Sequence, residues 1–408
     1  MKAQRGRGVG VLACSLVLAS LPGCPGTPAP GALDAQLPGP GPSRDAVPPD
    51  SLYVCPAGER MCRDRCVDYR TNPDHCGRCG HGCLGGSCER GRCQPQRLAS
   101  GLFFPEGLVV EGEWLYVAQV VVPATPPGQE PRPRSQQILR VPTRGGSTTV
   151  IHSCTGRCRP LLATDGFLYL AVDGGFVKIP LEGGAEVPVF GASDVTAVAT
   201  DGRVLVGFSY REGGGPPSLF WRALNGGAAR SISTAPCLMR PMAAAVDGDA
   251  VFWVGAANPS GVPEGQVCRV SRSTGAVQLL ASGSGDLNGI VLAGDRLVVS
   301  DFYWGRLLSA PRAGGKLAAV ALGRVKPGAL RVDGSQLFWL EEEATSIYSL
   351  APGAGVPEVI ATGQTGVRDL LVTGTAVYWS MGGIDPTDAS YLAPPGPNPP
   401  GAIGRWAR

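Results

Sequence analysis

Alternating apolar and polar positions recur along the chain from residue 95 to the C-terminus. Short runs rich in β-branched and aromatic residues stand on both sides of a turn glycine, as in LLATDGFLYLA around Gly166 and LRVDGSQLFWL around Gly334. Two such runs joined through Asp-Gly or a similar turn predict a β-hairpin. Units of this kind centre on Gly112, Gly166, Gly202, Gly248, Gly294, Gly334 and Gly374. We therefore expect an all-β repeat fold over this part of the chain.

Most units continue into a second hairpin built around a pair of glycines. Examples are Gly145-Gly146 in ILRVPTRGGSTTVI and Gly183-Gly184 in FVKIPLEGGAEVPVF. Glycine supplies the positive φ angles that such tight turns need. Each unit is therefore expected to hold four antiparallel strands, and turn glycines 36 to 54 residues apart match the blades of a β-propeller. Seven units predict seven blades; six or eight would follow if one unit were misread.

The seventh unit lacks a fourth strand, and a matching segment stands before the first unit. After AVYWS, the chain supplies only AIGRWAR, residues 402–408. The segment PQRLASG, residues 95–101, has the same form as VQLLASG, residues 277–283, which precedes the fifth unit. We therefore expect the N-terminal strand to complete the last blade, which would remove the exposed edges of an open ring.

The repeat pattern, Gly-apolar-x-x-Asp-Gly-x-apolar-Tyr, resembles that of bacterial propellers of the NHL, TolB-like and YWTD-like group, over residues 95–408. The resemblance implies the fold and leaves the function open, because propellers host both binding and catalysis. Four tryptophans recur near the second strand of their units, and we expect them to pack between blades rather than to stack on a ligand. They are Trp114, Trp253, Trp339 and Trp379.

Residues 51–94 form a separate cysteine-rich segment. Its cysteines are Cys55, Cys62, Cys66, Cys76, Cys79, Cys83, Cys88 and Cys93. So short a segment cannot stabilise itself by hydrophobic burial alone, so a disulfide framework is expected. Eight cysteines allow 105 pairings, and the sequence leaves the connectivity open. The alternative is a zinc site built from Cys76 and Cys79 with the nearby His75 and His81.

The run CVDYRTNPDHCGRCGHGC in this segment resembles cysteine-rich modules of myxobacterial surface proteins and, more loosely, the stigma-specific cysteine-rich proteins of plants. This resemblance covers only residues 55–93. It implies a spacer or adhesion unit and no chemistry.

The N-terminus has the pattern of an export signal over residues 1–23. Basic residues precede an apolar segment, residues 8–21, that is too short to span a bilayer as a stable helix. The segment ends in LPGC, which resembles a bacterial lipobox and implies that Cys24 is lipidated and becomes the mature N-terminus. By resemblance to Gram-negative sorting, Pro25 and Gly26, with no Asp after the cysteine, favour the outer membrane, facing the periplasm or the cell surface. A soluble secreted protein is the alternative.

Residues 24–50 contain eight prolines and almost no large apolar side chain. Such a segment cannot bury enough surface to fold, so a disordered tether is expected. The net charge of the whole chain is only +3, and no basic block could follow a phosphate backbone, which argues against nucleic acid as a partner. The expected contact with a membrane is the lipid anchor alone, and the expected state is a monomer.

The residues at the starts of the innermost strands should form a ring of mixed charge around the central channel. This ring is the candidate binding site, and a merely solvated rim is the alternative. Its members are Glu106, Arg159, Asp194, Arg240, Asn288, Lys326, Arg368 and Asp369.

Two of these strand starts, PEGLVV and LNGIVL, resemble the metal-binding strand starts of gluconolactonase-like propellers. The resemblance implies that Glu106 and Asn288 are oxygen ligands for Ca²⁺, which prefers carboxylate and amide oxygens. A metal-dependent hydrolase or lyase, with Ca²⁺ or Mg²⁺, is therefore the alternative function. No catalytic motif supports assigning catalytic residues, and without metal no cofactor is expected.

Long insertions between second and third strands should crowd one face of the ring, together with the connections between blades. Disulfides pairing Cys154 with Cys158, and Cys237 with Cys268, would stiffen this face. The cysteine-rich segment should attach at the other face, near Arg408. Because binding usually resides on loops held by a rigid scaffold, we expect a surface-anchored lipoprotein that binds a protein, a peptide or a polysaccharide at its loop-rich face.

Overall fold

The computed structural model describes residues 54–121, 135–192, 195–210, 216–237, 239–257, 264–382 and 401–408. Cys24, Asp194, the expected signal peptide and tether, and most of the long insertions lie outside these ranges. The chain divides into two compact units, residues 1–54 and 55–408, and the second unit contains the cysteine-rich segment and the propeller. Within the described residues, no helix is long and apolar enough to cross a membrane.

The cysteine-rich segment is built on four disulfides and two short hairpins. The strands are β1 (Arg60–Cys62), β2 (Arg65–Val67), β3 (Cys88–Glu89) and β4 (Arg92–Cys93). The bridges are Cys55–Cys66, Cys62–Cys79, Cys76–Cys88 and Cys83–Cys93. Cys76, Cys83, Cys88 and Cys93 are buried against one another, so the bridges themselves form the core of this segment. The cysteines proposed as zinc ligands are both consumed by disulfides.

Seven four-stranded antiparallel sheets follow, which confirms the seven-bladed propeller. Blade 1 contains β6 (Glu106–Glu111), β7 (Trp114–Val121), β8 (Ser135–Pro142) and β9 (Thr149–Cys154). Blade 2 contains β10 (Cys158–Thr164), β11 (Phe167–Val172), β12 (Gly175–Pro180) and β13 (Val187–Gly191). Blade 3 contains β14 (Val195–Thr200), β15 (Val204–Ser209), β16 (Ser218–Ala223) and β17 (Arg230–Ser233).

The remaining blades repeat this order. Blade 4 contains β18 (Arg240–Asp247), β19 (Ala250–Ala257), β20 (Glu264–Ser271) and β21 (Val277–Ser284). Blade 5 contains β22 (Leu287–Ala293), β23 (Arg296–Asp301), β24 (Arg306–Pro311) and β25 (Ala318–Ala321). Blade 6 contains β26 (Pro327–Asp333), β27 (Gln336–Glu341), β28 (Ser346–Leu350) and β29 (Glu358–Ala361).

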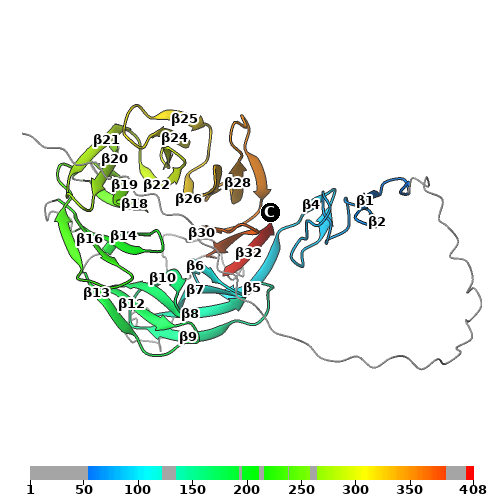
Figure 1. Cartoon of the computed structure of the whole chain (residues 1–408), viewed down its shortest axis with the longest axis horizontal. Helices are drawn as coiled ribbons and strands as arrows, with labels where there is room; N and C mark the ends of the chain where they lie inside the picture. The colour runs from blue at the N-terminus through cyan, green and yellow to red at the C-terminus, as the bar shows by residue number, and fades with distance from the viewer. Residues whose placement is uncertain are drawn as a thin grey trace, which may run out of the picture. The chain divides into compact units, whose positions relative to one another are not determined.

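Blade 7 joins the two ends of the propeller. It contains β30 (Val367–Val372), β31 (Ala376–Met381) and β32 (Gly401–Ala407), and its outermost strand is β5 (Gln96–Leu102). The register runs from Gly401 opposite Leu102 to Arg405 opposite Gln96. Each innermost strand packs against the next, and β30 packs against β6, so the ring is closed as expected. Figure 1 shows these strands around the centre, with β9, β13, β21 and β25 on the outside.

Every innermost strand carries a β-bulge where it pairs with the second strand of its blade. The register shifts lie near the start of each strand, from Glu106 to Val109 in β6 and from Gly328 to Arg331 in β26. The other five strands have equivalent shifts. A bulge adds one residue to one strand and therefore inverts the alternation of side chains beyond it.

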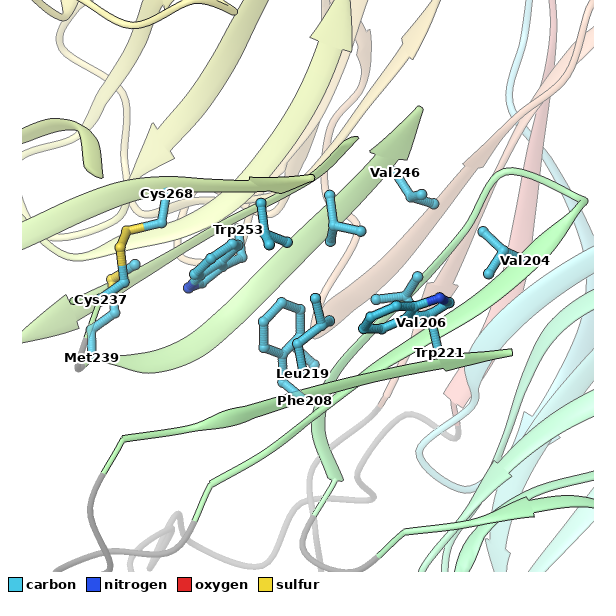
Figure 2. Packing of buried hydrophobic residues seen from close by; sticks show 13 residues of the cluster. Val204, Val206, Phe208, Leu219, Trp221, Cys237, Met239, Val246, Trp253 and Cys268 are labelled. Carbon is cyan, nitrogen blue, oxygen red and sulfur yellow. A yellow bond between two sulfur atoms is a disulfide. The ribbon is translucent and has the colours of Figure 1, made fainter. Parts of the chain in front are cut away.

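The hydrophobic core lies between blades. Trp253, Trp339 and Trp379 are almost fully buried, as expected for packing residues, and Trp114 is half-buried beneath the Arg140 guanidinium. Figure 2 shows the Trp253 indole beside the Cys237–Cys268 disulfide, with Phe208 below it. The Phe208 and Trp253 ring centroids are 5.3 Å apart.

The expected pairings of the four propeller cysteines occur in the structure. Cys154–Cys158 closes the connection from blade 1 to blade 2, and Cys237–Cys268 joins the connection before blade 4 to the third strand of that blade. The face that carries the inter-blade connections is called the connection face below. Both bridges stiffen it.

The cysteine-rich segment contacts the last strand of the propeller near the C-terminus. The Trp406 indole N–H donates to the Cys93 carbonyl at 3.0 Å, and His81 Nε2 lies 2.5 Å from the Arg408 carbonyl oxygen. Ala407 completes the cluster of buried cysteines. β32 runs from the connection face to the opposite face, so the segment attaches on the side opposite the connections, as expected.

Candidate functional site in the central channel

The structure places the predicted ring residues where the innermost strands begin. Glu106 and Arg240 are the first residues of β6 and β18, and Lys326 directly precedes β26. The second residues of β10, β22 and β30 are Arg159, Asn288 and Arg368, and Asp369 follows. Asp194 lies outside the described residues. The positions match the expectation, and their role in binding stays a prediction.

The channel is a cavity of about 620 Å³ lined by the innermost strands of the ring. Long consecutive runs such as residues 196–200 and 288–292 line it, because the innermost strand is a sheet edge that turns its backbone toward the axis. Among the described residues, its charged lining consists of Arg159, Arg331, Arg368 and Asp369. The ring residues that do not line it are Glu106, Arg240 and Lys326.

Asp369 is the centre of a charge cluster that spans four blades. Its side chain is 7% exposed and lies 3.2 Å from Arg159 Nη2 and 2.8 Å from Arg331 Nη2. The same carboxylate accepts backbone N–H bonds from Gly107 at 3.0 Å and Leu370 at 2.8 Å. Blades 6, 7, 1 and 2 therefore meet at this one carboxylate, across the seam where the ring closes.

Electrostatics favour the charged state of this cluster. Burial alone would raise the pKa of Asp369, but Arg159, Arg331 and the two backbone N–H groups hold that pKa below its ordinary value. Asp369 in turn raises the pKa of Arg159. The pKa of Arg331 is lowered, first by burial and then by repulsion from Arg159, while Asp369 opposes both effects.

Arg331 is not among the residues predicted from the sequence, because that prediction rested on strand starts. It is the fifth residue of β26 and follows the bulge that begins at Gly328. The bulge inverts the side-chain alternation, so the position of Arg331 cannot be read from the period of the strand. A signal was present nonetheless, since an arginine within the apolar run ALRV is unusual in a buried strand.

The two expected calcium ligands are occupied by hydrogen bonds from the protein. Glu106 Oε1 accepts from the Gln136 amide at 2.8 Å, and Asn288 Oδ1 accepts from the Ser300 hydroxyl at 2.8 Å. The clusters of His, Cys, Asp and Glu found among the described residues do not include Glu106, and each contains at least one cysteine that forms a disulfide. Calcium binding therefore stays a prediction without added support.

Arg368 differs from the other channel arginines. Its guanidinium carbon lies 4.5 Å from the centre of the Phe104 ring, a cation–π contact. Among the described residues it has no hydrogen-bond or ion-pair partner. Lys326, by contrast, forms an ion pair with Glu343 at the rim. Burial raises the pKa of Glu342, and the nearby Arg368 and Lys326 oppose that rise.

An exposed aromatic turn on the connection face was also not predicted from the sequence. Tyr303 and Trp304 lie between β23 and β24 and are 61% and 49% exposed. Their ring centroids are 5.0 Å apart in an edge-to-face arrangement. The sequence shows the pair in DFYWGR, but only the structure shows that the rings do not pack into the core.

Buried polar contacts hold this aromatic turn in place. The fully buried Asp301 accepts N–H bonds from Asp286 and Trp304, each at 3.2 Å, and pairs with Arg306. The Arg324 N–H donates to the Gly305 carbonyl at 2.9 Å. Gly305 has φ +62°, and a Cβ there would lie 2.0 Å from the Arg324 carbonyl oxygen, so only glycine fits. The turn is therefore rigid.

Comparisons with known proteins show the fold and no family. No protein-family model matches the chain, and no curated protein sequence matches it. Among solved structures, the AfRom2 CNH domain matches with 9% identity and a TM-score of 0.51, over 76% of this chain and 98% of that chain. The computationally designed Ika8 protein matches with 12% identity and a TM-score of 0.49, over 76% and 98%. BamB from Moraxella catarrhalis matches with 12% identity and a TM-score of 0.44, over 73% and 82%.

Sequence identities this low do not allow a function to be transferred from these proteins to this chain. Altogether 708 chains of solved structures match, so the architecture is widely shared. Function must therefore be argued from the residues of the site. The likeness of the cysteine-rich segment to surface-protein modules stays a prediction.

Proposed function

We propose that this chain is an exported, lipid-anchored binding protein that takes a protein, peptide or polysaccharide ligand at its connection face. The observation that carries the proposal is the aromatic turn formed by Tyr303 and Trp304. Large aromatic side chains are the residues that most often dominate the energetics of binding surfaces. Here they are exposed and held rigid, so little conformational entropy is lost when a ligand covers them.

Neighbouring residues extend the aromatic turn into an apolar patch. Leu322 and Val325 are exposed on the connection between blades 5 and 6. The hydrogen bond from Arg324 to Gly305 brings this connection against the turn. Exposed apolar side chains that gather in this way favour an interaction site over a merely solvated rim.

Alanine substitution of both aromatic residues tests the proposed surface. Tyr303→Ala with Trp304→Ala should reduce the amount of captured ligand at least about tenfold, because each exposed aromatic anchor contributes on the order of 1–2 kcal/mol. The measurement is capture from a cell-envelope extract by an immobilised fragment, residues 51–408, with bound protein and carbohydrate quantified.

A matched control distinguishes binding at this surface from nonspecific adsorption. Val356 is 81% exposed and lies between β28 and β29, on the face opposite the connections. Val356→Ala should leave capture unchanged. Equal capture by the double variant and the Val356 variant would show that the aromatic turn is not the binding surface.

The proposed anchor has its own test. Cys24→Ala removes the thiol that would carry the lipid, so the protein should move from the membrane fraction to the soluble fraction. Fractionation followed by immunoblotting measures the distribution. Unchanged membrane retention of the variant would contradict lipid anchoring, whatever the outcome of the capture experiment.

A further inference from the structure

Positive charge exceeds negative charge in the lining of the central channel. Among the described residues, three guanidinium groups, those of Arg159, Arg331 and Arg368, line the same cavity as one carboxylate, that of Asp369. The described part of the lining thus carries a net charge of +2. Like-charge repulsion between Arg159 and Arg331 persists even with Asp369 between them, and a bound anion would relieve it.

Hydrogen-bond donors are also in excess. Each guanidinium offers five N–H donors, and a carboxylate accepts about four hydrogen bonds. Asp369 already accepts from two backbone N–H groups and from both of its arginine partners. The side chains of Arg159 and Arg331 are 45% and 37% exposed, so part of each guanidinium group still faces the channel.

Arg368 supplies the feature that structural packing does not explain. Arg159 and Arg331 have a clear structural role, because they neutralise a buried carboxylate between blades. Arg368 lines the same cavity and, within the described part of the chain, it rests on the Phe104 ring and lies near the Glu342 carboxylate without a hydrogen bond or ion pair to it. A guanidinium that rests on an aromatic ring is oriented while its donors stay available.

We propose that the central channel binds a small dianion bearing carboxylate or phosphate oxygens, held by Arg368 together with the free donors of Arg159 and Arg331. A charge of −2 balances the lining, and guanidinium forks match the geometry of carboxylate and phosphate oxygens. The cavity volume, about 620 Å³, falls in the usual range for small-molecule sites. This site is separate from the aromatic turn, so it goes beyond the function proposed above. Its experimental test is independent of the test of that function.

Isothermal titration of the full chain in detergent tests the proposal. The probes are inorganic phosphate and succinate near neutral pH, titrated at constant ionic strength maintained with sodium chloride. We expect saturable binding of at least one probe, and the probe that binds shows whether the anion is a phosphate or a dicarboxylate. Arg368→Gln should weaken that binding at least about tenfold, as expected for the loss of charge-assisted hydrogen bonds.

The control removes the same charge elsewhere. Arg144 lies in the turn between β8 and β9, and its side chain is 85% exposed. Arg144→Gln should bind the probe as the unmodified chain does. The absence of saturable binding for both probes, or an equal loss in the Arg144 and Arg368 variants, would overturn the proposal. Thermal unfolding of both variants checks that they are folded, which is expected because Arg368 has no hydrogen-bond partner among the described residues.

Discussion

Deletion of Gln96–Gly101 is expected to abolish cooperative unfolding of the whole propeller, although it removes only most of one outermost strand. β5 pairs with β32 along its length, and its residues Leu98, Ala99 and Leu102 are buried where blade 7 meets blade 1. Loss of the buried Leu98 and Ala99 side chains together with one strand pairing should cost about 5 kcal/mol, which is comparable to the total stability of many domains. Thermal unfolding followed by circular dichroism measures the effect.

Truncation through Cys93 is the matched control for this deletion. It removes the cysteine-rich segment and leaves β5 in place. The contacts from Trp406 to Cys93 and from His81 to Arg408 are lost, so a smaller cost of about 1–3 kcal/mol is expected. The truncated chain should still unfold in one cooperative transition. If the deletion variant unfolded as cooperatively as the truncated chain, the pairing of β5 with β32 would not be what closes the ring.

Asp369→Ala should lower the free energy of unfolding by about 3 kcal/mol, because removal of one member of a buried charge cluster leaves the others uncompensated. Arg159 and Arg331 would then repel each other, and the N–H groups of Gly107 and Leu370 would lose their acceptor. The estimate is at the low end for buried pairs because both guanidiniums keep contact with water in the channel. Chemical denaturation at neutral pH measures the change.

The pH dependence of this effect has a definite sign. The pKa of Asp369 is lowered in the folded state, so its contribution is fully present above the pKa of an unfolded aspartate, about 3.9, and is lost as the pH falls through the folded value. The difference between the unmodified chain and Asp369→Ala should therefore be constant near neutral pH and shrink in acid. Asp295 is exposed in the turn between β22 and β23, and Asp295→Ala should change stability by less than about 0.5 kcal/mol at any pH. An equal loss of stability from the two substitutions would mean that Asp369 does not stabilise the junction where the ring closes.

The propeller could be predicted from the sequence because its signals are local. Hairpin turns with glycine, alternating strands and the repeated spacing all lie within a few tens of residues. The similarity of PQRLASG to VQLLASG indicated the closing strand. The pairings Cys154–Cys158 and Cys237–Cys268 followed from the expected strand order. The four bridges of the cysteine-rich segment did not, because its short strands have no periodicity to place one cysteine opposite another.

The candidate site was predicted only in part, for reasons that concern side-chain direction. Strand starts correctly located Arg159, Arg368 and Asp369, but Glu106 forms its hydrogen bond with Gln136 and does not line the channel. Arg331 lines the channel because of a bulge, which a single sequence does not reveal. The exposure of Trp304 was equally hidden, since its pattern resembles that of the buried tryptophans and only the tertiary arrangement distinguishes them.

Because a bulge recurs in all seven innermost strands, the side chains that line the channel can change one blade at a time. Each bulge interrupts the regular ladder close to the channel, while the second and third strands of every blade pair without a register shift. A substitution next to a bulge can therefore alter what the channel presents without repacking a blade. The ring offers seven equivalent positions for such changes, so ligand preference could diversify among chains of this fold while stability stays the same.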